Sequence, residues 1–197
     1  MVTTSPRLHP SLIANLHDTL LLKEGHFAFR SGRHSSVLLD RDRLLADPGN
    51  ASSVGYALAK AFFTDKVDTV ATPSIWGVAL AQWVAYFLEP KAKVVHAVPT
   101  SDGERHIQHN LRDMLEGKRV LLVDNLIVSG NTLEAFADEV AALGGDIVGL
   151  GALWDLADPT IHGMRVVALL DDVYPAWLPD QCPICAEGNH ETENIPY

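Results

Sequence analysis

Residues 120–132, with the sequence VLLVDNLIVSGNT, constrain the fold of this chain more than any other segment. Apolar residues run up to Asp124, as in a buried strand, and a small polar turn follows at residues 129–132. After Thr132 the apolar residues recur at helical spacing up to Leu143, where a pair of glycines ends the pattern. The segment therefore predicts a strand, an acidic residue, a tight polar turn and a helix.

The predicted turn is suited to holding an anion. It places backbone N–H groups and short hydroxyls at a helix N-terminus, where the helix dipole favours negative charge. Asp124, at the carboxyl end of the strand, can accept hydrogen bonds from sugar hydroxyls or hold a cation. This combination suits a phosphorylated sugar, and the glycine patterns of other phosphate loops are absent from the sequence. The alternative interpretation is an ordinary strand-to-helix turn.

Length and charge exclude several classes of protein. A chain of 197 residues is long enough for one well-cored domain. Its net charge of −10 argues against non-specific binding to nucleic acid or to anionic membranes. The sequence has no apolar run of membrane-spanning length and no basic-then-apolar signal pattern at its N-terminus. We therefore expect a cytoplasmic protein.

Strand and helix patterns alternate along most of the chain, which predicts an α/β fold with a mainly parallel sheet flanked by helices. A helix is predicted at 11–22, two short strands at 27–40, and a helix start at Asp47-Pro48. Further strands are predicted at 69–72, 93–98, 119–124, 147–154 and 165–170, with helices near 78–88 and after Thr132. Ligands of such sheets bind beyond the carboxyl ends of the strands, so residues 73–77 and 129–132 are expected to share one site.

Residues 120–132 resemble the phosphoribosyl-pyrophosphate (PRPP) signature of type I phosphoribosyltransferases, in which two adjacent acids precede a Thr/Ser/Gly turn. Asp124 stands at the first acidic position and Asn125 at the second, while Val128 and Asn131 replace the more usual hydroxyl and glycine. Residues 25–40, 72–81 and 177–188 resemble, in order, segments of orotate phosphoribosyltransferases and of similar bacterial proteins. The resemblance implies one domain over 1–197, with an N-terminal hood segment (1–45), an α/β core (50–175) and a short C-terminal tail (176–197).

The resemblance also implies a function and a site. The protein would transfer a phosphoribosyl group from PRPP to a pyrimidine-like base, with orotate favoured, and would release pyrophosphate with the help of Mg²⁺. A homodimer is implied as well. The implied catalytic residues are Asp124, Arg105 and His106, with Asp124 also at the metal. PRPP would be bound by Asn125, Val128, Ser129, Gly130, Asn131, Thr132, Ser74, Ile75, Trp76 and Gly77, and the base by Arg30, Leu38 and Leu39.

Two departures from the family pattern keep a second interpretation open. Asn125 replaces an acid, and the stretch that should form the mobile catalytic loop carries Arg105 and His106 but no lysine before Lys118. The alternative is a PRPP or nucleotide sensor of the same fold with reduced catalysis. The pattern beginning at Arg30 favours the enzyme, because a phosphate sensor needs no base pocket. The role of Trp76 also has alternatives. Packing against the sheet is the expected role, because it is usual for a large aromatic residue, but Trp76 could also stack on a ligand or narrow the pocket.

Cys182 and Cys185 in the tail, with His190, supply part of a zinc site. A structural zinc ion needs four ligands, and the sequence contains no second closely spaced ligand pair of the usual kind. His162, Asp180 or a partner subunit could complete the set. The alternative is a reduced cysteine pair or a simple buried turn.

Overall fold

The structure, a computed structural model, describes residues 21–101, 105–170, 175–188 and 191–195. The strands are β1 (Leu22–Phe29), β2 (His34–Leu39), β3 (Thr69–Thr72), β4 (Lys93–Pro99), β5 (Arg105–Ile107), β6 (Arg119–Ile127), β7 (Asp146–Asp155), β8 (Thr160–Ile161), β9 (Met164–Arg165), β10 (Val167–Leu170), β11 (Ala176–Trp177) and β12 (Glu193–Ile195). The helices are α2 (Arg41–Ala46), α3 (Pro48–Ala59), α4 (Val78–Phe87), α5 (Asn131–Ala142) and α6 (Pro183–Glu187), with short 3₁₀ turns η1 (Lys60–Phe62), η2 (Ile75–Gly77), η3 (His109–Met114) and η4 (Pro179–Gln181). A helix was expected at 11–22, but residues 11–20 lie outside the described residues. Leu22, the last residue of the expected helix, instead begins strand β1.

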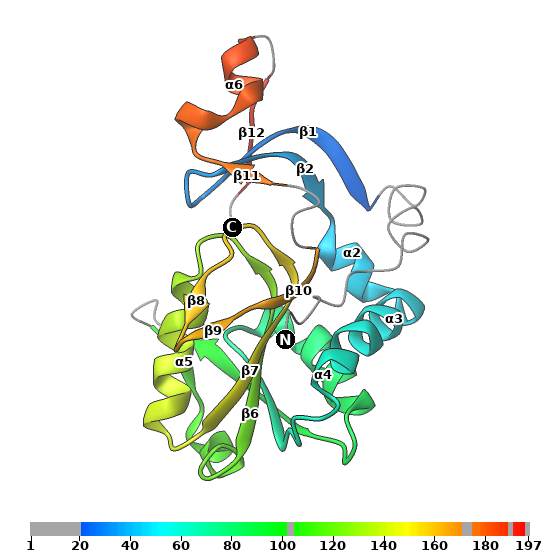
Figure 1. Ribbon diagram of the computed structural model, residues 1–197, viewed down its shortest axis with the longest axis vertical. Coiled ribbons are helices and arrows are strands. Elements are labelled where there is room, and N and C mark those ends of the chain that lie inside the picture. The colour runs from blue at the N-terminus through cyan, green and yellow to red at the C-terminus, as the bar shows by residue number, and fades with distance from the viewer. Residues whose placement is uncertain (1–20, 102–104, 171–174, 189–190, 196–197) are drawn as a thin grey trace.

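A six-stranded sheet in the order β10-β7-β6-β3-β4-β5 forms the centre of the molecule. All neighbouring strands in it are parallel except β5, which runs antiparallel to β4. Helices α3 and α4 pack on one face of the sheet and α5 packs on the other (Figure 1). The predicted fold class, a mainly parallel sheet flanked by helices, is confirmed. Among the described helices, none has the length and apolar character needed to cross a membrane.

The core explains why the strand before Asp124 reads as a continuous apolar run. Residues 120–123 of β6 are fully buried, because a central parallel strand is covered by helices on both faces. Two apolar clusters result, one beneath α3 and α4 and one beneath α5. The first cluster continues into β1 and β2, so the N-terminal hairpin is packed onto the main core.

A second, four-stranded sheet in the order β11-β2-β1-β12 joins the N-terminal and C-terminal strands of the described residues, and we call it the small sheet. The β1–β2 hairpin lies at its centre, and the tail strands β11 and β12 pair with the outer sides of β2 and β1. Figure 1 shows the small sheet and α6 above the main sheet. The N-terminal segment and the tail were predicted as separate parts of the domain, whereas here they contribute to one sheet.

Local capping residues fix where the helices near the site begin. Asp47 accepts a hydrogen bond from the Asn50 backbone N–H at 2.8 Å, so α3 starts at the predicted Asp-Pro signal. The sequence pattern did not predict α2, which Asp40 caps by accepting from the Arg43 N–H at 3.1 Å. This short helix directs the chain from the small sheet toward the main sheet and brings Arg41 to the cavity described next.

Candidate functional site

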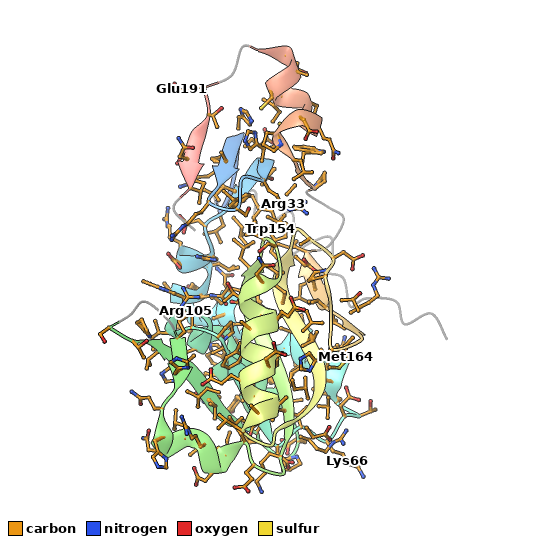
Figure 2. All side chains as sticks on the ribbon, turned by 90° about the vertical axis from the view of Figure 1, so that its left-hand side faces the viewer. Arg33, Lys66, Arg105, Trp154, Met164 and Glu191 are labelled. Carbon is orange, nitrogen blue, oxygen red and sulfur yellow. The ribbon has the colours of Figure 1, made fainter. Side chains whose placement is uncertain are left out.

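A cavity of about 690 Å³ opens beyond the carboxyl end of β6. It is lined by the turn after β1, the start of α2, the loop after β3, the start of β5 and the whole segment from Asp124 into α5. The lining residues are Arg30, Ser31, Arg41, Asp42, Ser74, Trp76, Arg105, Asp124, Asn125, Leu126, Ile127, Val128, Ser129, Gly130, Asn131, Thr132 and Leu133. In Figure 2, Trp154 near the end of β7 marks the end of the core that faces the small sheet, and Lys66 marks the opposite end. The cavity therefore occupies the edge where parallel α/β sheets bind ligands.

The turn between β6 and α5 presents unused backbone donors to this cavity. Gly130 adopts a left-handed conformation with φ of 88°, which favours glycine. A side chain there would also bring its Cβ within 2.8 Å of Pro159, so the close packing requires glycine as well. No described side chain makes a capping hydrogen bond to α5 at this residue. The first amides of a twelve-residue helix thus remain available to an anion, beside the hydroxyls of Ser129 and Thr132.

Asp124 is half-buried at the floor of the cavity. Burial raises the pKa of its carboxyl to about 6, and several nearby donors and charges oppose that rise. They are the Asn125 N–H, which donates to Oδ1 at 2.7 Å, the guanidinium groups of Arg41 and Arg105, and the Leu126 N–H. A cation or several hydroxyl donors bound at this carboxylate would offset its cost of burial.

Asn125 connects two loops of the site. Its side chain is almost fully buried, and its amide nitrogen donates to the Trp76 backbone oxygen at 2.6 Å. Its Oδ1 has no hydrogen-bond partner among the described residues. The residue that replaces the family's second acid therefore holds the loop after β3 against the end of β6.

The loop after β3 contributes only part of its predicted residues to the cavity. Ser74 and Trp76 line it, whereas Ile75 is half exposed and Gly77 is buried at the start of α4. A Cβ at Gly77 would overlap Thr72 Oγ1, so glycine permits the close approach of the loop to β3. The expectation that Trp76 packs against the sheet is wrong: it is 65% exposed, because its loop ends at the cavity rather than over the core.

Three arginines from separate segments line the cavity of this acidic protein: Arg30, Arg41 and Arg105. The first and last were predicted. Arg41 was not assigned to the site, although a local run of arginines from residue 30 to residue 43 signalled it. His106 points elsewhere, and its Nδ1 lies 3.5 Å from Glu139 Oε1.

Leu38 and Leu39 also lie outside the cavity lining. Their side chains are buried in the core, and their backbones pair with Lys23 and Leu22 of β1. A direct contact of these two residues with a base stays a prediction.

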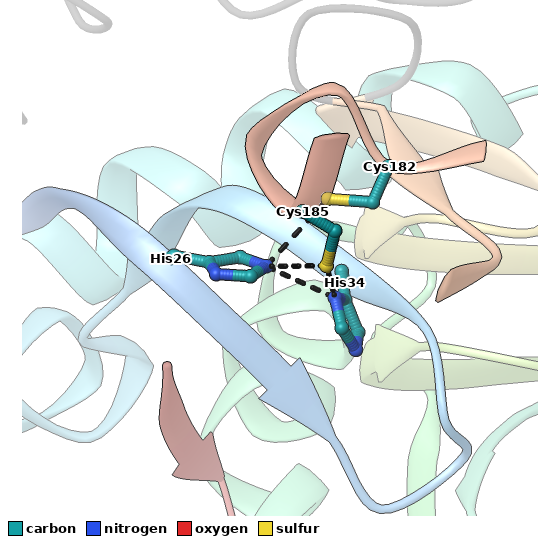
Figure 3. Close-up of side chains that lie close together, drawn as sticks. All are labelled: His26, His34, Cys182 and Cys185. Atoms are coloured by element: carbon teal, nitrogen blue, oxygen red, sulfur yellow. Dashed lines mark hydrogen bonds between the residues drawn. The ribbon is translucent and has the colours of Figure 1, made fainter. Parts of the chain in front are cut away.

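A separate cluster lies in the small sheet, where four potential metal ligands converge: His26, His34, Cys182 and Cys185 (Figure 3). The sequence pattern identified the two cysteines but not the two histidines, and the proposed His190 lies outside the described residues. The alternative ligand His162 instead contacts Asp138 at 2.8 Å. Asp180 is not a member of the cluster.

Comparison with known proteins places the chain in a family. Residues 40–169 match the phosphoribosyl transferase domain. Orotate phosphoribosyltransferase from Thermus thermophilus is 36% identical over 168 residues, which cover 85% of this chain and 90% of that protein. The orotate phosphoribosyltransferase from Caldanaerobacter subterraneus subsp. tengcongensis is 26% identical over 169 residues, covering 85% and 87%. In fold, the chain is similar to the crystal structure of orotate phosphoribosyltransferase from Aeropyrum pernix, with a TM-score of 0.65 and 22% identity over 81% of this chain and 92% of that one. The chain belongs to the phosphoribosyltransferase family, and the two relatives named above, which match most of its length, are orotate phosphoribosyltransferases.

Proposed function

We propose that this protein transfers the phosphoribosyl group of PRPP to a pyrimidine base, with orotate favoured, and releases pyrophosphate in a Mg²⁺-dependent reaction. The observation that carries the proposal is one cavity that combines an uncapped helix N-terminus, a half-buried carboxylate and three arginines. These groups match the phosphate, hydroxyl and pyrophosphate parts of the donor. The orotate phosphoribosyltransferases among its relatives favour the same substrate class.

The 5′-phosphate of PRPP would occupy the turn at residues 129–132. Its oxygens would accept hydrogen bonds from the first amides of α5 and from the hydroxyls of Ser129 and Thr132. Asp124 lies a few residues upstream on the same cavity and would accept hydrogen bonds from the ribose hydroxyls. Phosphate and ribose would thus be held by one continuous segment.

The pyrophosphate would lie toward Ser74, Trp76 and Arg105. Backbone donors of the loop after β3 and the Arg105 guanidinium would hold its charge, and Asn125 would keep that loop in place through the Trp76 carbonyl. The Asp124 carboxylate is an oxygen ligand of the kind that Mg²⁺, a hard cation, prefers. When bound beside Asp124, Mg²⁺ would supply positive charge that offsets the charge developing on the leaving group.

The reaction itself asks for positioning and charge stabilisation rather than covalent chemistry from the protein. A ring nitrogen of the base attacks the anomeric carbon and gives up its proton to solvent or to the departing group. The bond from that carbon to pyrophosphate oxygen breaks, and its electron pair leaves with pyrophosphate. Positive charge develops on the ribose during this step, and the carboxylate of Asp124 would stabilise it. Arg30, in the turn of the β1–β2 hairpin, would bind the anionic base.

A homodimer and a cytoplasmic location form part of the proposal. On α3, α4 and the adjoining turn, Tyr56, Phe63 and Tyr86 are each about half exposed and form a ring cluster with Phe87. An aromatic surface of this kind suits a subunit interface. The two free cysteines suit a reducing compartment. Light scattering on the purified chain measures the oligomeric state directly, and a monomer at all concentrations would contradict the dimer.

The decisive assay is pyrophosphate release from PRPP and Mg²⁺, measured separately with orotate, uracil, xanthine, guanine, hypoxanthine and adenine. Release that depends on orotate supports the proposal, and release with another base alone would reassign the acceptor. Calorimetry should give Mg²⁺-dependent PRPP binding that Asp124→Asn abolishes and the exposed-site control Asp113→Asn retains. PRPP binding without turnover of any base would instead identify the sensor that the lysine-free loop leaves open.

A further inference from the structure

The four side chains that meet in the small sheet come from opposite ends of the chain. His26 and His34 belong to the β1–β2 hairpin, whereas Cys182 and Cys185 belong to the tail around α6, 151 positions away in the case of Cys185 and His34. All their ligand atoms lie within 4.8 Å of one another (Figure 3). We propose that these four residues bind one structural zinc ion, which fastens the tail to the hairpin and fixes the turn that faces the cavity.

The distances agree with tetrahedral zinc. His26 Nε2 lies 3.0 Å from His34 Nδ1 and 3.6 Å and 3.5 Å from the sulfurs of Cys182 and Cys185. The Cys185 sulfur lies 3.2 Å from His34 Nδ1. Zinc bonds of about 2.0–2.1 Å to nitrogen and about 2.3 Å to sulfur place tetrahedral ligand atoms about 3.3–3.8 Å apart. To accommodate the ion, the 3.0 Å and 3.2 Å separations would lengthen by a few tenths of an ångström, and any pair near the 4.8 Å limit would shorten.

Three ligand atoms of this cluster compete for one nitrogen of His26. His26 Nε2 carries at most one proton and faces three other ligand atoms. His26 and Cys182 are buried, so water is largely excluded there as a substitute partner. Two thiolates and two neutral imidazoles instead give a donor set whose charge balances that of a divalent ion. Such a set of sulfur and nitrogen ligands selects zinc over Mg²⁺ or Ca²⁺.

A neighbouring residue already orients one ligand. Thr192 Oγ1 lies 2.9 Å from His26 Nδ1, the ring nitrogen that points away from the cluster. A hydrogen bond from Nδ1–H to this hydroxyl leaves the lone pair on Nε2 directed at the metal, which is the usual arrangement behind a zinc-bound histidine. Thr192 lies just before β12, so the tail contributes to the site in a second way.

The location of the cluster indicates its consequence for the substrate site, a point that rests on the proposed function. The chain between His26 and His34 contains the turn that bears Arg30 and Ser31, and both residues line the cavity. Four protein ligands leave no open coordination position, so the ion is structural rather than catalytic. Its effect on the reaction would therefore be to hold Arg30 in position for the base.

Metal content and cobalt spectroscopy test the site itself, whether or not the protein is a transferase. The full chain, purified without chelator, should contain about one zinc per chain, and dialysis against chelator should remove it. Co²⁺ added to the stripped protein should give the intense visible bands of tetrahedral cobalt and a thiolate charge-transfer band. Because the chain has only two cysteines, thiol titration should find both protected in the zinc form and both reactive in the stripped form. Protein without zinc that also gives no cobalt bands, or a Cys182–Cys185 disulfide in freshly purified protein, would overturn the site.

Variants and kinetics test the role of the ion. Cys182→Ser and His34→Gln should each lose zinc, and His162→Gln should keep it, since His162 lies outside the cluster. Zinc removal should lower the melting temperature by roughly 10 °C. It should raise KM for the base at least tenfold, while the affinity for PRPP stays within about twofold. Zinc removal that leaves KM for the base unchanged would overturn the positioning role. If Cys182→Ser fails to fold, chelated wild-type protein supplies the same comparison.

Discussion

Replacing Asp124 by Asn should stabilise the unliganded protein while abolishing its binding of PRPP. The carboxyl has a pKa of about 6 in the folded chain and an ordinary value of 3.8 in the unfolded one. Between these values the folded state holds a proton that the unfolded state has lost, so stability falls as the pH rises through this window. The full shift corresponds to about 3 kcal/mol lost from the wild type above pH 7. The side-chain amide of the variant would keep an acceptor for the Asn125 N–H and carries no charge to bury.

The expected stability difference follows the titration of Asp124. Asp124→Asn should exceed the wild type by about 3 kcal/mol at pH 8, by about 1.6 kcal/mol at pH 5 and by about 0.6 kcal/mol at pH 4. Urea denaturation at these pH values, without Mg²⁺ or PRPP, measures the difference. The matched control Asp113→Asn, at an exposed acid, should stay within about 0.5 kcal/mol of wild type at every pH. A pH-independent gain, or a loss of stability at pH 8, would refute the assignment of a half-buried carboxylate with a raised pKa at this position.

Three further substitutions probe the cavity. Asn125→Asp restores the family's usual acid but sets a carboxylate against the Trp76 carbonyl oxygen, where the amide now donates at 2.6 Å. It should lower the free energy of unfolding by about 2–4 kcal/mol at pH 8 and by less at pH 5. A loss of the same size at both pH values would contradict this. Trp76→Phe should abolish the change in tryptophan fluorescence on PRPP binding. It should leave the melting temperature within about 2 °C of wild type, because the ring is mostly exposed. A retained fluorescence change would indicate that PRPP binds away from Trp76. Arg105→Ala should lower kcat by about 10²-fold or more with little change in the affinity for the base. Stopped-flow kinetics that show equal losses in kcat and in base affinity would contradict the position assigned to the pyrophosphate beside Arg105.

The fold was predictable because its signals are local. Asp47-Pro48, the apolar run before Asp124 and the glycines after Leu143 each specify an element boundary through short-range capping or burial. The segment from Asp124 to Thr132 was likewise identified from its own residues, and the structure places all of it on one cavity. Nothing beyond a strand, a turn and a helix start was needed to infer it.

What the sequence did not yield depends on contacts between distant segments. The Asn125 amide reaches the Trp76 carbonyl only because β3 pairs with β6. From the sequence alone, the replacement of the family's second acid by Asn125 therefore looked like a simple loss of charge. Trp76 was expected to pack against the sheet because it is large and aromatic, yet it lines the cavity and is mostly exposed. His26 and His34 match no common ligand spacing, and their shared direction depends on the hairpin register.

The pairing of β1 with β12 places Phe29 beside Ile195, so the ends of the described chain must meet before the small sheet is complete. During synthesis the main sheet can form from consecutive strands and helices while the tail is still absent. The β1–β2 hairpin, by contrast, keeps two open edges until β11 and β12 have been synthesised. The base-facing wall of the cavity should therefore be the last part of the protein to mature, and a chain cut short before β11 should keep its PRPP loop but expose unpaired strand edges to aggregation.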